Sequence, residues 1–92
     1  MRVRVPLPVL IVYPMYYVYA IRSLIANYTY VGISDNVERR VTQHNSGFEK
    51  TTKPYRPFRI ILIEEFSDRP SARVREKYLK TSSGKRYLRK LL

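Results

Sequence analysis

The chain has 92 residues, no cysteine and a formal net charge of +11 at pH 7. This length suits one small domain, and the lack of cysteine excludes disulfides, thiolate zinc sites and cysteine nucleophiles. The excess of 18 Lys and Arg over 7 Asp and Glu favours nucleic acid as a partner, because neutralising phosphates releases condensed counterions. A basic surface without a specific partner is the simpler alternative.

Residues 1–14 differ in pattern from the rest of the chain. They hold three prolines and an apolar run from Val9 to Tyr13 that is too short to span a membrane. We therefore expect an N-terminal extension, or a segment upstream of a natural start at Met15, followed by one domain over 15–92. With neither a secretion signal nor a membrane span expected, the predicted location is the cytoplasm, without a membrane partner.

Strand and helix patterns alternate from Met15 onwards. Two segments rich in tyrosine and β-branched residues predict a β-hairpin, and a later continuous apolar run predicts a third strand covered on both faces. Asp35 followed by Glu38 is typical of a capping box at a helix start. The order ββαβαα predicts an α+β domain with helices flanking a three-stranded antiparallel sheet. Strands are expected at 16–21, 28–33 and 59–66, helices at 36–45, 68–80 and 84–92, and a loop at 48–58.

The hairpin tyrosines fall on defined faces, because successive side chains of a strand point to opposite sides. Tyr17 and Tyr19 share one face of the first strand, and Tyr28 and Tyr30 share one face of the second. If Tyr19 lies opposite Tyr30, their hydroxyl groups form a cluster, and Gly32 leaves room beside it for a ligand. Cross-strand aromatic packing explains these tyrosines without any chemistry.

The helix expected after the hairpin mixes polar and apolar side chains on one stripe. Val37, Arg40, Val41 and His44 share that stripe by helical periodicity. The guanidinium and the imidazole are therefore candidates for a site. In the simpler interpretation, Arg40 extends to the rim of the core and His44 is a half-buried histidine with its hydrogen bonds satisfied.

The next helix carries the same kind of mixture. Ala72, Glu76 and Leu79 share one stripe, and Glu76 is the only acid in the strongly basic segment 69–92. An inward carboxylate needs a partner, which is either a metal ion or a basic side chain such as Arg40 or a nearby lysine. The last predicted helix is also basic, with Lys85, Arg86, Arg89 and Lys90.

Taken in order, these residues resemble the motifs of the GIY-YIG nuclease superfamily, in particular its small single-domain bacterial members of the YhbQ type. The first motif is similar to "YVY" at 17–19 and the second to "YVG" at 30–32. Tyr17 stands where the family's first motif has a glycine, and an asparagine near the C-terminus of some larger members has no counterpart. The family's tyrosines, arginine, histidine and metal-binding glutamate match Tyr19, Tyr30, Arg40, His44 and Glu76.

The resemblance implies a metal-dependent endonuclease that hydrolyses DNA phosphodiester bonds in repair or recombination. Glu76 would hold one divalent cation, Mg²⁺ or Mn²⁺, and Arg40 would bind the phosphate. Tyr19 or Tyr30 would position the water and take its proton, while His44 would relay a proton or contact the phosphate. The alternative is a non-catalytic nucleic-acid-binding module on the same scaffold, and RNA is not excluded as a partner. Nucleic-acid contacts are expected from Lys53, Arg73, Lys77, Lys80, Lys85 and Arg86.

Overall fold

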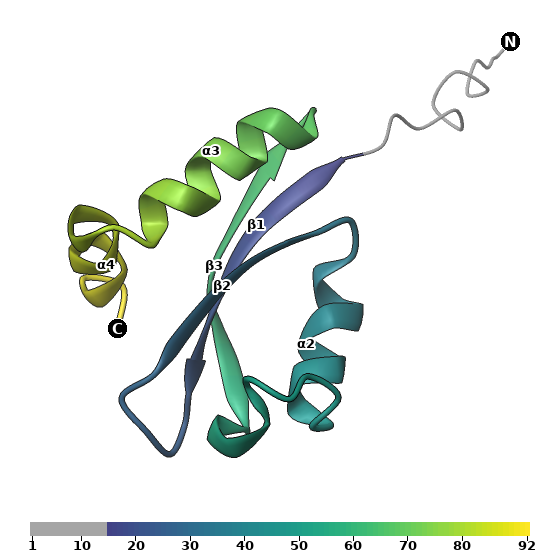
Figure 1. Ribbon diagram of the computed structural model, residues 1–92, viewed down its shortest axis with the longest axis vertical. Coiled ribbons are helices and arrows are strands. Elements are labelled where there is room, and N and C mark those ends of the chain that lie inside the picture. Colours follow the sequence, from purple (N-terminus) through teal and green to yellow (C-terminus); the bar gives the residue numbers. More distant parts are fainter. Residues whose placement is uncertain (1–14) are drawn as a thin grey trace, which may run out of the picture.

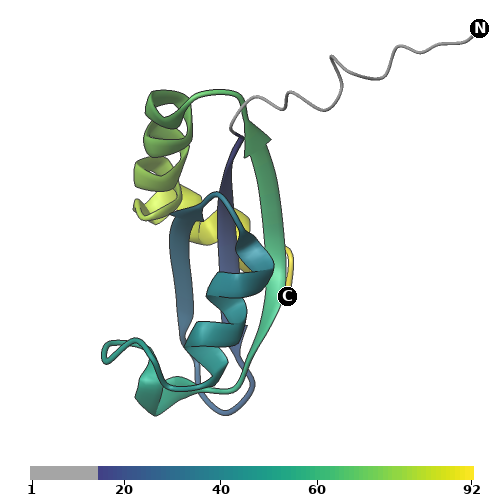
Figure 2. The ribbon, with the colours of Figure 1, turned by 90° about the vertical axis from the view of Figure 1, so that its right-hand side faces the viewer.

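A computed structural model describes residues 15–92, so the predicted extension at 1–14 lies outside the described residues. The three strands form one antiparallel sheet in the order β2-β1-β3. Helix α2 covers one face of this sheet, and α3 and α4 cover the other (Figure 1 and Figure 2). The predicted α+β class and the order ββαβαα are confirmed. The strands are β1 (Tyr16–Ser23), β2 (Thr29–Ser34) and β3 (Phe58–Phe66); the helices are α2 (Val37–Asn45), α3 (Arg69–Leu79) and α4 (Ser82–Arg89).

The central strand β1 supplies both halves of the hydrophobic core. Val18 and Ala20 point to the side of α3 and α4, whereas Tyr19 and Ile21 point to the side of α2, and all four are fully buried. Alternation along a strand explains this division, since neighbouring residues face opposite sides of the sheet. The candidate tyrosine Tyr19 and the α3 stripe thus belong to different layers.

The prediction that the third strand is covered on both faces is wrong. β3 lies at an edge of the sheet, and Ile60 and Ile63 are 42% and 50% exposed. A shift in pairing register places Ile60 opposite Ile21 and Ile63 opposite Tyr19, so both isoleucines lie on the α2 side. The nine-residue helix α2 leaves them uncovered.

The helix boundaries follow from side chains that cap the first turn. Asn36, not Asp35, caps α2, because its Oδ1 accepts a hydrogen bond from the Arg39 amide at 3.0 Å. The predicted capping box is therefore wrong, and Asp35 instead pairs with the Arg39 side chain at 2.8 Å. Thr81 caps α4 at the Gly84 amide, which starts this helix two residues before the predicted position.

The predicted loop 48–58 contains the short 3₁₀ helix η1 (Lys53–Tyr55). Within residues 15–92, no helix is both long enough and apolar enough to cross a membrane.

Helices α3 and α4 meet at Gly84, and this contact sets where the basic residues of α4 lie. A Cβ at Gly84 would lie 2.1 Å from the Tyr78 carbonyl oxygen and 2.4 Å from the Leu79 Cα. Because backbone atoms cannot rotate away, we expect Gly84→Ala to lower the free energy of unfolding by about 3 kcal/mol. Urea unfolding followed by circular dichroism measures this change. Ser83→Ala, at an exposed neighbouring position, is the control, and equal stability of the two variants would contradict the close contact.

Candidate active site

Three aromatic side chains meet on the α2 side of the sheet. Tyr19 pairs with Gly32, and Tyr30 pairs with Ile21, so Tyr19 and Tyr30 are not directly opposite in the register that forms. The two rings are diagonal neighbours on one face, with centroids 6.2 Å apart. The His44 ring lies between helix and sheet, 4.7 Å from the Tyr30 centroid and 6.0 Å from that of Tyr19. The structure therefore brings together two tyrosines and the histidine.

Gly32 admits the Tyr19 ring rather than a ligand. A Cβ at Gly32 would lie 2.8 Å from the Tyr19 hydroxyl oxygen and 2.9 Å from its Cζ. The prediction of ligand space at this position is therefore wrong. The missing side chain instead lets the phenol of Tyr19 lie flat enough on β2 to reach helix α2.

A buried chain of hydrogen bonds fixes the histidine. The Tyr19 hydroxyl and His44 Nε2 are 3.0 Å apart, and His44 Nδ1 and Thr52 Oγ1 are 2.8 Å apart. Thr52 Oγ1 donates its one hydrogen to the Glu49 carbonyl at 3.4 Å, so it accepts from His44 Nδ1–H. This network assigns the tautomer in which His44 Nε2 accepts the Tyr19 hydroxyl proton.

Burial separates the two tyrosines chemically. Tyr19 is fully buried, and desolvation raises its pKa to about 12, with the nearby Tyr30 adding to the rise and Arg40 opposing it. Its hydroxyl is also committed to His44. Tyr30 remains partly exposed on β2. Tyr30 is therefore the tyrosine of this pair that can meet a water molecule or a substrate.

The pKa of His44 is lowered from 6.5, chiefly by burial and next by the positive charge of Arg40. His44 is the only histidine of the chain, so its imidazole signal can be followed by NMR without assignment. We expect a midpoint below 6.5. Because the folded value is depressed, the stability contributed by neutral His44 is complete above about pH 6.5 and is lost as pH falls through the folded value. A midpoint at or above 6.5 would contradict the buried, neutral assignment.

Arg40 lies at the rim of the same layer. Its Nη1 donates to Gln43, and its Nη2 donates to Glu49 at 3.1 Å. Its side chain is 21% exposed and borders a shallow hollow together with Arg39 and Arg69. A guanidinium has five donor hydrogens, so two side-chain bonds leave further donors for a phosphate.

Glu76 lies in the opposite layer. Its neighbours Ala72 and Leu79 are fully buried, which confirms the predicted stripe, and its own side chain is 15% exposed. Lys80 Nζ lies 3.1 Å from one carboxylate oxygen and Arg73 Nε lies 3.8 Å from the other. Within residues 15–92, these are its ion pairs, and no hydrogen bond joins it to the tyrosines, Arg40 or His44. Glu76 is therefore not in direct contact with the other residues that match the family's motifs.

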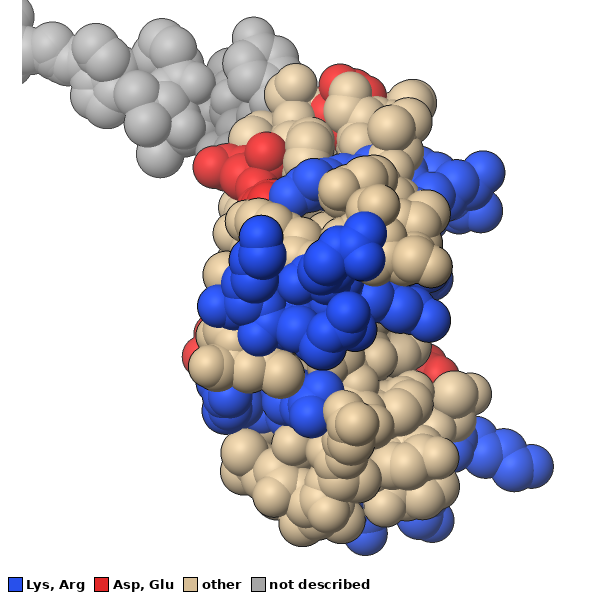
Figure 3. Space-filling view, turned by 90° about the vertical axis from the view of Figure 1, so that its left-hand side faces the viewer, with Lys and Arg blue, Asp and Glu red and all other residues tan. Residues whose placement is uncertain are grey.

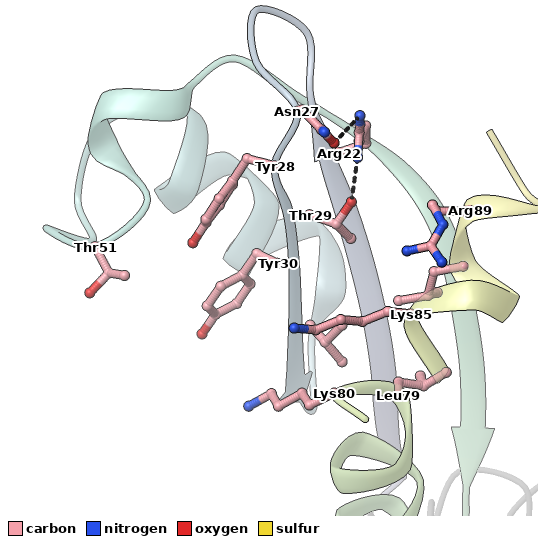
Figure 4. A pocket seen from close by; sticks show the side chains of 12 residues that line it. Arg22, Asn27, Tyr28, Thr29, Tyr30, Thr51, Leu79, Lys80, Lys85 and Arg89 are labelled. Carbon is pink, nitrogen blue, oxygen red and sulfur yellow. Dashed lines mark hydrogen bonds between the residues drawn. The ribbon is translucent and has the colours of Figure 1, made fainter. Parts of the chain in front are cut away.

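A cleft on the open edge of β2 connects the two layers. Its volume is about 540 Å³, and no acidic residue lines it. Tyr30 lines it from β2, and Lys80 lines it from the end of α3 (Figure 4). Because Lys80 binds Glu76, the carboxylate is one ion pair away from the cleft that Tyr30 borders.

The six residues predicted to contact nucleic acid are exposed but not equivalent. Lys80 and Lys85 line the cleft, whereas Arg86 lies next to Lys85 on α4 and does not line it. Figure 3 shows Lys and Arg side chains gathered in a band across the face that carries α4.

The other three predicted contact residues do not line the cleft. Arg73 pairs with Glu76. Lys53, in η1, belongs to the α2 side, and Lys77 is exposed on α3.

Arg22 and Thr52 were not predicted from the sequence as contributors to the site. Arg22 lines the cleft from β1, although nothing in the hairpin pattern distinguishes it from an ordinary exposed strand residue. Thr52 orients His44 from a loop without periodicity, so no signal marked it. Arg89 also lines the cleft, and its spacing of four residues from Lys85 on α4 is the signal that places the two on one stripe.

Comparisons with known proteins agree on one family. The model described as "GIY-YIG catalytic domain" matches residues 15–89. UPF0213 protein SH2523 of Staphylococcus haemolyticus is 37% identical over 75 residues, which are 80% of this chain and 90% of the relative. The matched range 15–89 contains Tyr19, Tyr30, Arg40, His44 and Glu76.

Proposed function

This chain belongs to the GIY-YIG nuclease family, and from that premise we propose that it is a metal-dependent endonuclease acting on DNA in repair or recombination. The observation that carries the proposal is the position of Tyr30. Its ring packs against the buried His44 on one side of β2, and the same residue borders a cleft lined by lysine and arginine. A phenol at the edge of a cationic cleft meets a phosphodiester where positive charge has gathered.

Each residue has a separate task in this proposal. Arg40 binds a non-bridging phosphate oxygen with the donors that Gln43 and Glu49 leave free, and stabilises the charge that develops there. Tyr30 orients the attacking water and accepts its proton. His44 holds the Tyr30 ring in place through packing, because its own nitrogens are engaged by other partners.

Glu76 is the proposed ligand for one Mg²⁺ or Mn²⁺ ion. Within residues 15–92, no three His, Asp or Glu side chains come together, so Glu76 would be assisted by water and substrate phosphate. Mg²⁺ commonly binds in this manner, through one or two carboxylates. When bound, the cation supplies charge neutralisation at the phosphoryl and leaving oxygens. To bind the cation, the Glu76 carboxylate would have to release its ion pairs with Lys80 and Arg73.

A non-catalytic nucleic-acid-binding module is the second candidate function. It is favoured by the ion pairs of the two key groups, since Glu76 is held by Lys80 and Arg40 by Glu49. A protein with these pairs undisturbed keeps its basic face and binds nucleic acid without hydrolysing it. DNA and RNA are both possible ligands for such a module.

A cleavage panel separates these two functions. Single-stranded, duplex, flap and junction DNA, and a single-stranded RNA, are incubated with the protein in Mg²⁺, Mn²⁺ or EDTA. We expect cleavage of at least one DNA in Mg²⁺ or Mn²⁺, and none in EDTA. Binding to the same molecules without any cleavage in either metal would refute the nuclease proposal and favour the binding module.

The two tyrosines should respond differently to removal of the hydroxyl group. Tyr30→Phe should lower the cleavage rate about a hundredfold, as expected for loss of a general base. Tyr19→Phe should mainly lower stability, because it leaves the buried His44 Nε2 without a donor. Rates measured under single-turnover conditions and urea unfolding of both variants test this. The reverse pattern would assign the base to Tyr19.

A further inference from the structure

We propose that the cleft at the β2 edge binds one unpaired nucleotide of a nucleic-acid strand, with its base beside Tyr28 and Tyr30 and its phosphate beside Lys80 and Lys85. This inference rests on the proposed action on nucleic acid and names the feature of the substrate that the protein recognises. It assigns to Tyr28 and Lys85 a role in selecting the substrate rather than in the chemical step.

The size of the cleft fits a single nucleotide. Its volume of about 540 Å³ falls in the usual range for small-molecule sites. The floor is apolar, formed by Val31, Leu79 and Leu88, of which Leu79 is fully buried. A paired base is stacked inside its duplex and cannot enter a cavity of this size, whereas an unpaired base can turn into it.

The charge of the cleft selects an anion. Four cationic residues line it and no acidic residue does, in contrast to the hollow beside Arg40, where Asp35 and Glu49 face three arginines. Two of the four, Lys80 and Lys85, extend their ammonium groups across β2 toward the side of Tyr30 (Figure 4). Arg22 is held by Asn27 at 2.8 Å and by Thr29 at 3.1 Å. Lys85 forms no ion pair within residues 15–92, and Lys80 is held by its exposed ion pair with Glu76. We therefore assign the phosphate to these two lysines, whose ammonium groups lie beside Tyr30.

The opposite wall of the cleft offers aromatic surface. Tyr28 immediately precedes β2 and Tyr30 lies within it, and both line the cleft (Figure 4). Tyr28 is braced from behind by Tyr55, with ring centroids 4.0 Å apart and planes within 11°. Bases stack on such rings regardless of sequence, and each stacked base contributes strongly to binding. Aromatic rings opposite lysines match the base and the phosphate of one nucleotide.

The test measures binding in EDTA, so that it requires no cleavage. Labelled DNA hairpins are compared by fluorescence anisotropy: one fully paired, one with a single unpaired nucleotide, and one with an abasic residue at that position. We expect the unpaired nucleotide to tighten binding about tenfold, and the abasic residue to lose this gain. Equal binding of the paired and unpaired hairpins would overturn the proposal, as would equal binding of the unpaired and abasic ones.

Lys85 and Arg86 are a matched pair for the protein side of the test. Both are exposed on α4 and carry one charge, but only Lys85 lines the cleft. Lys85→Gln should remove most of the tenfold preference, whereas Arg86→Gln should weaken all three hairpins alike. A preference that survives Lys85→Gln, or that falls equally in both variants, would place the nucleotide elsewhere.

Competitors identify the occupant, and cleavage identifies the function. Free deoxyadenosine monophosphate and poly-glutamate are added as competitors of the labelled hairpin that has the unpaired nucleotide. If either one displaces this hairpin at a lower concentration than the unlabelled hairpin does, the cleft does not bind a nucleotide of a strand. A protein that cleaves DNA but shows no preference for the unpaired nucleotide refutes this inference alone. A protein that shows the preference but never cleaves refutes the nuclease proposal alone.

Discussion

Replacing Glu76 with glutamine should abolish metal-dependent cleavage while nucleic-acid binding is kept or strengthened. Glutamine preserves the shape of the side chain but removes the only carboxylate of α3 and α4, and with it the proposed ligand for the cation. Loss of one negative charge beside Lys80, which lines the cleft, should also favour phosphate binding. Cleavage in Mg²⁺ and Mn²⁺, and anisotropy in EDTA, measure the two effects separately.

Glu65→Gln provides the control for Glu76. Glu65 is an exposed carboxylate on β3, so its loss changes the net charge by the same amount at a position outside the proposed site. We expect this control to cleave within about twofold of the wild-type rate, as is usual for exposed positions. Cleavage by Glu76→Gln at the rate of the control would exclude Glu76 as the metal ligand.

Replacing Arg40 with alanine should lower kcat/KM for cleavage by about two to three orders of magnitude, the usual cost of losing one strong transition-state donor. Arg40→Lys should recover only part of this loss, because lysine keeps the charge but not the paired donors. The alanine variant leaves Glu49 without its partner, yet the Glu49 side chain is 39% exposed and can be solvated. The fold should therefore persist, which circular dichroism and urea unfolding can check.

The neighbouring Arg39 is the matched control for Arg40. It is the next residue of α2, is more exposed, and pairs with Asp35 across one helical turn. Such surface pairs contribute little to stability, so Arg39→Ala should change cleavage by less than about threefold. If both alanine variants lose activity equally, Arg40 acts only through the general positive charge of this region, and its assignment as a phosphate ligand is wrong.

The sequence predicts the fold well because local signals and the fold agree. The tyrosine-rich hairpin, the stripe of α2 and the stripe of α3 are all where periodicity placed them. The misplaced details depend on contacts between distant residues. Pairing register, which the sequence left open, puts Gly32 opposite Tyr19, and sheet order puts β3 at an edge. Neither register nor strand order is encoded in a local pattern.

The candidate site was only partly predictable. Helical periodicity identified Arg40, His44 and Glu76 as polar residues that lean inward. In the structure His44 is fully buried, and the side chains of Arg40 and Glu76 are mostly buried. Periodicity could not indicate that the first two and the third lie in layers on opposite sides of the sheet. It also could not separate Tyr19 from Tyr30, since the difference lies in burial against α2.

In the proposed mechanism, Glu76 and Tyr30 serve one metal-dependent site although they approach it from different sides of the sheet. Paramagnetic broadening by Mn²⁺ tests it directly, with the protein bound to a non-cleavable phosphorothioate DNA. We expect substoichiometric Mn²⁺ to broaden the side-chain signals of Tyr30 and His44, and Glu76→Gln to prevent this. Broadening that spares Tyr30, or that persists in Glu76→Gln, would contradict the claim.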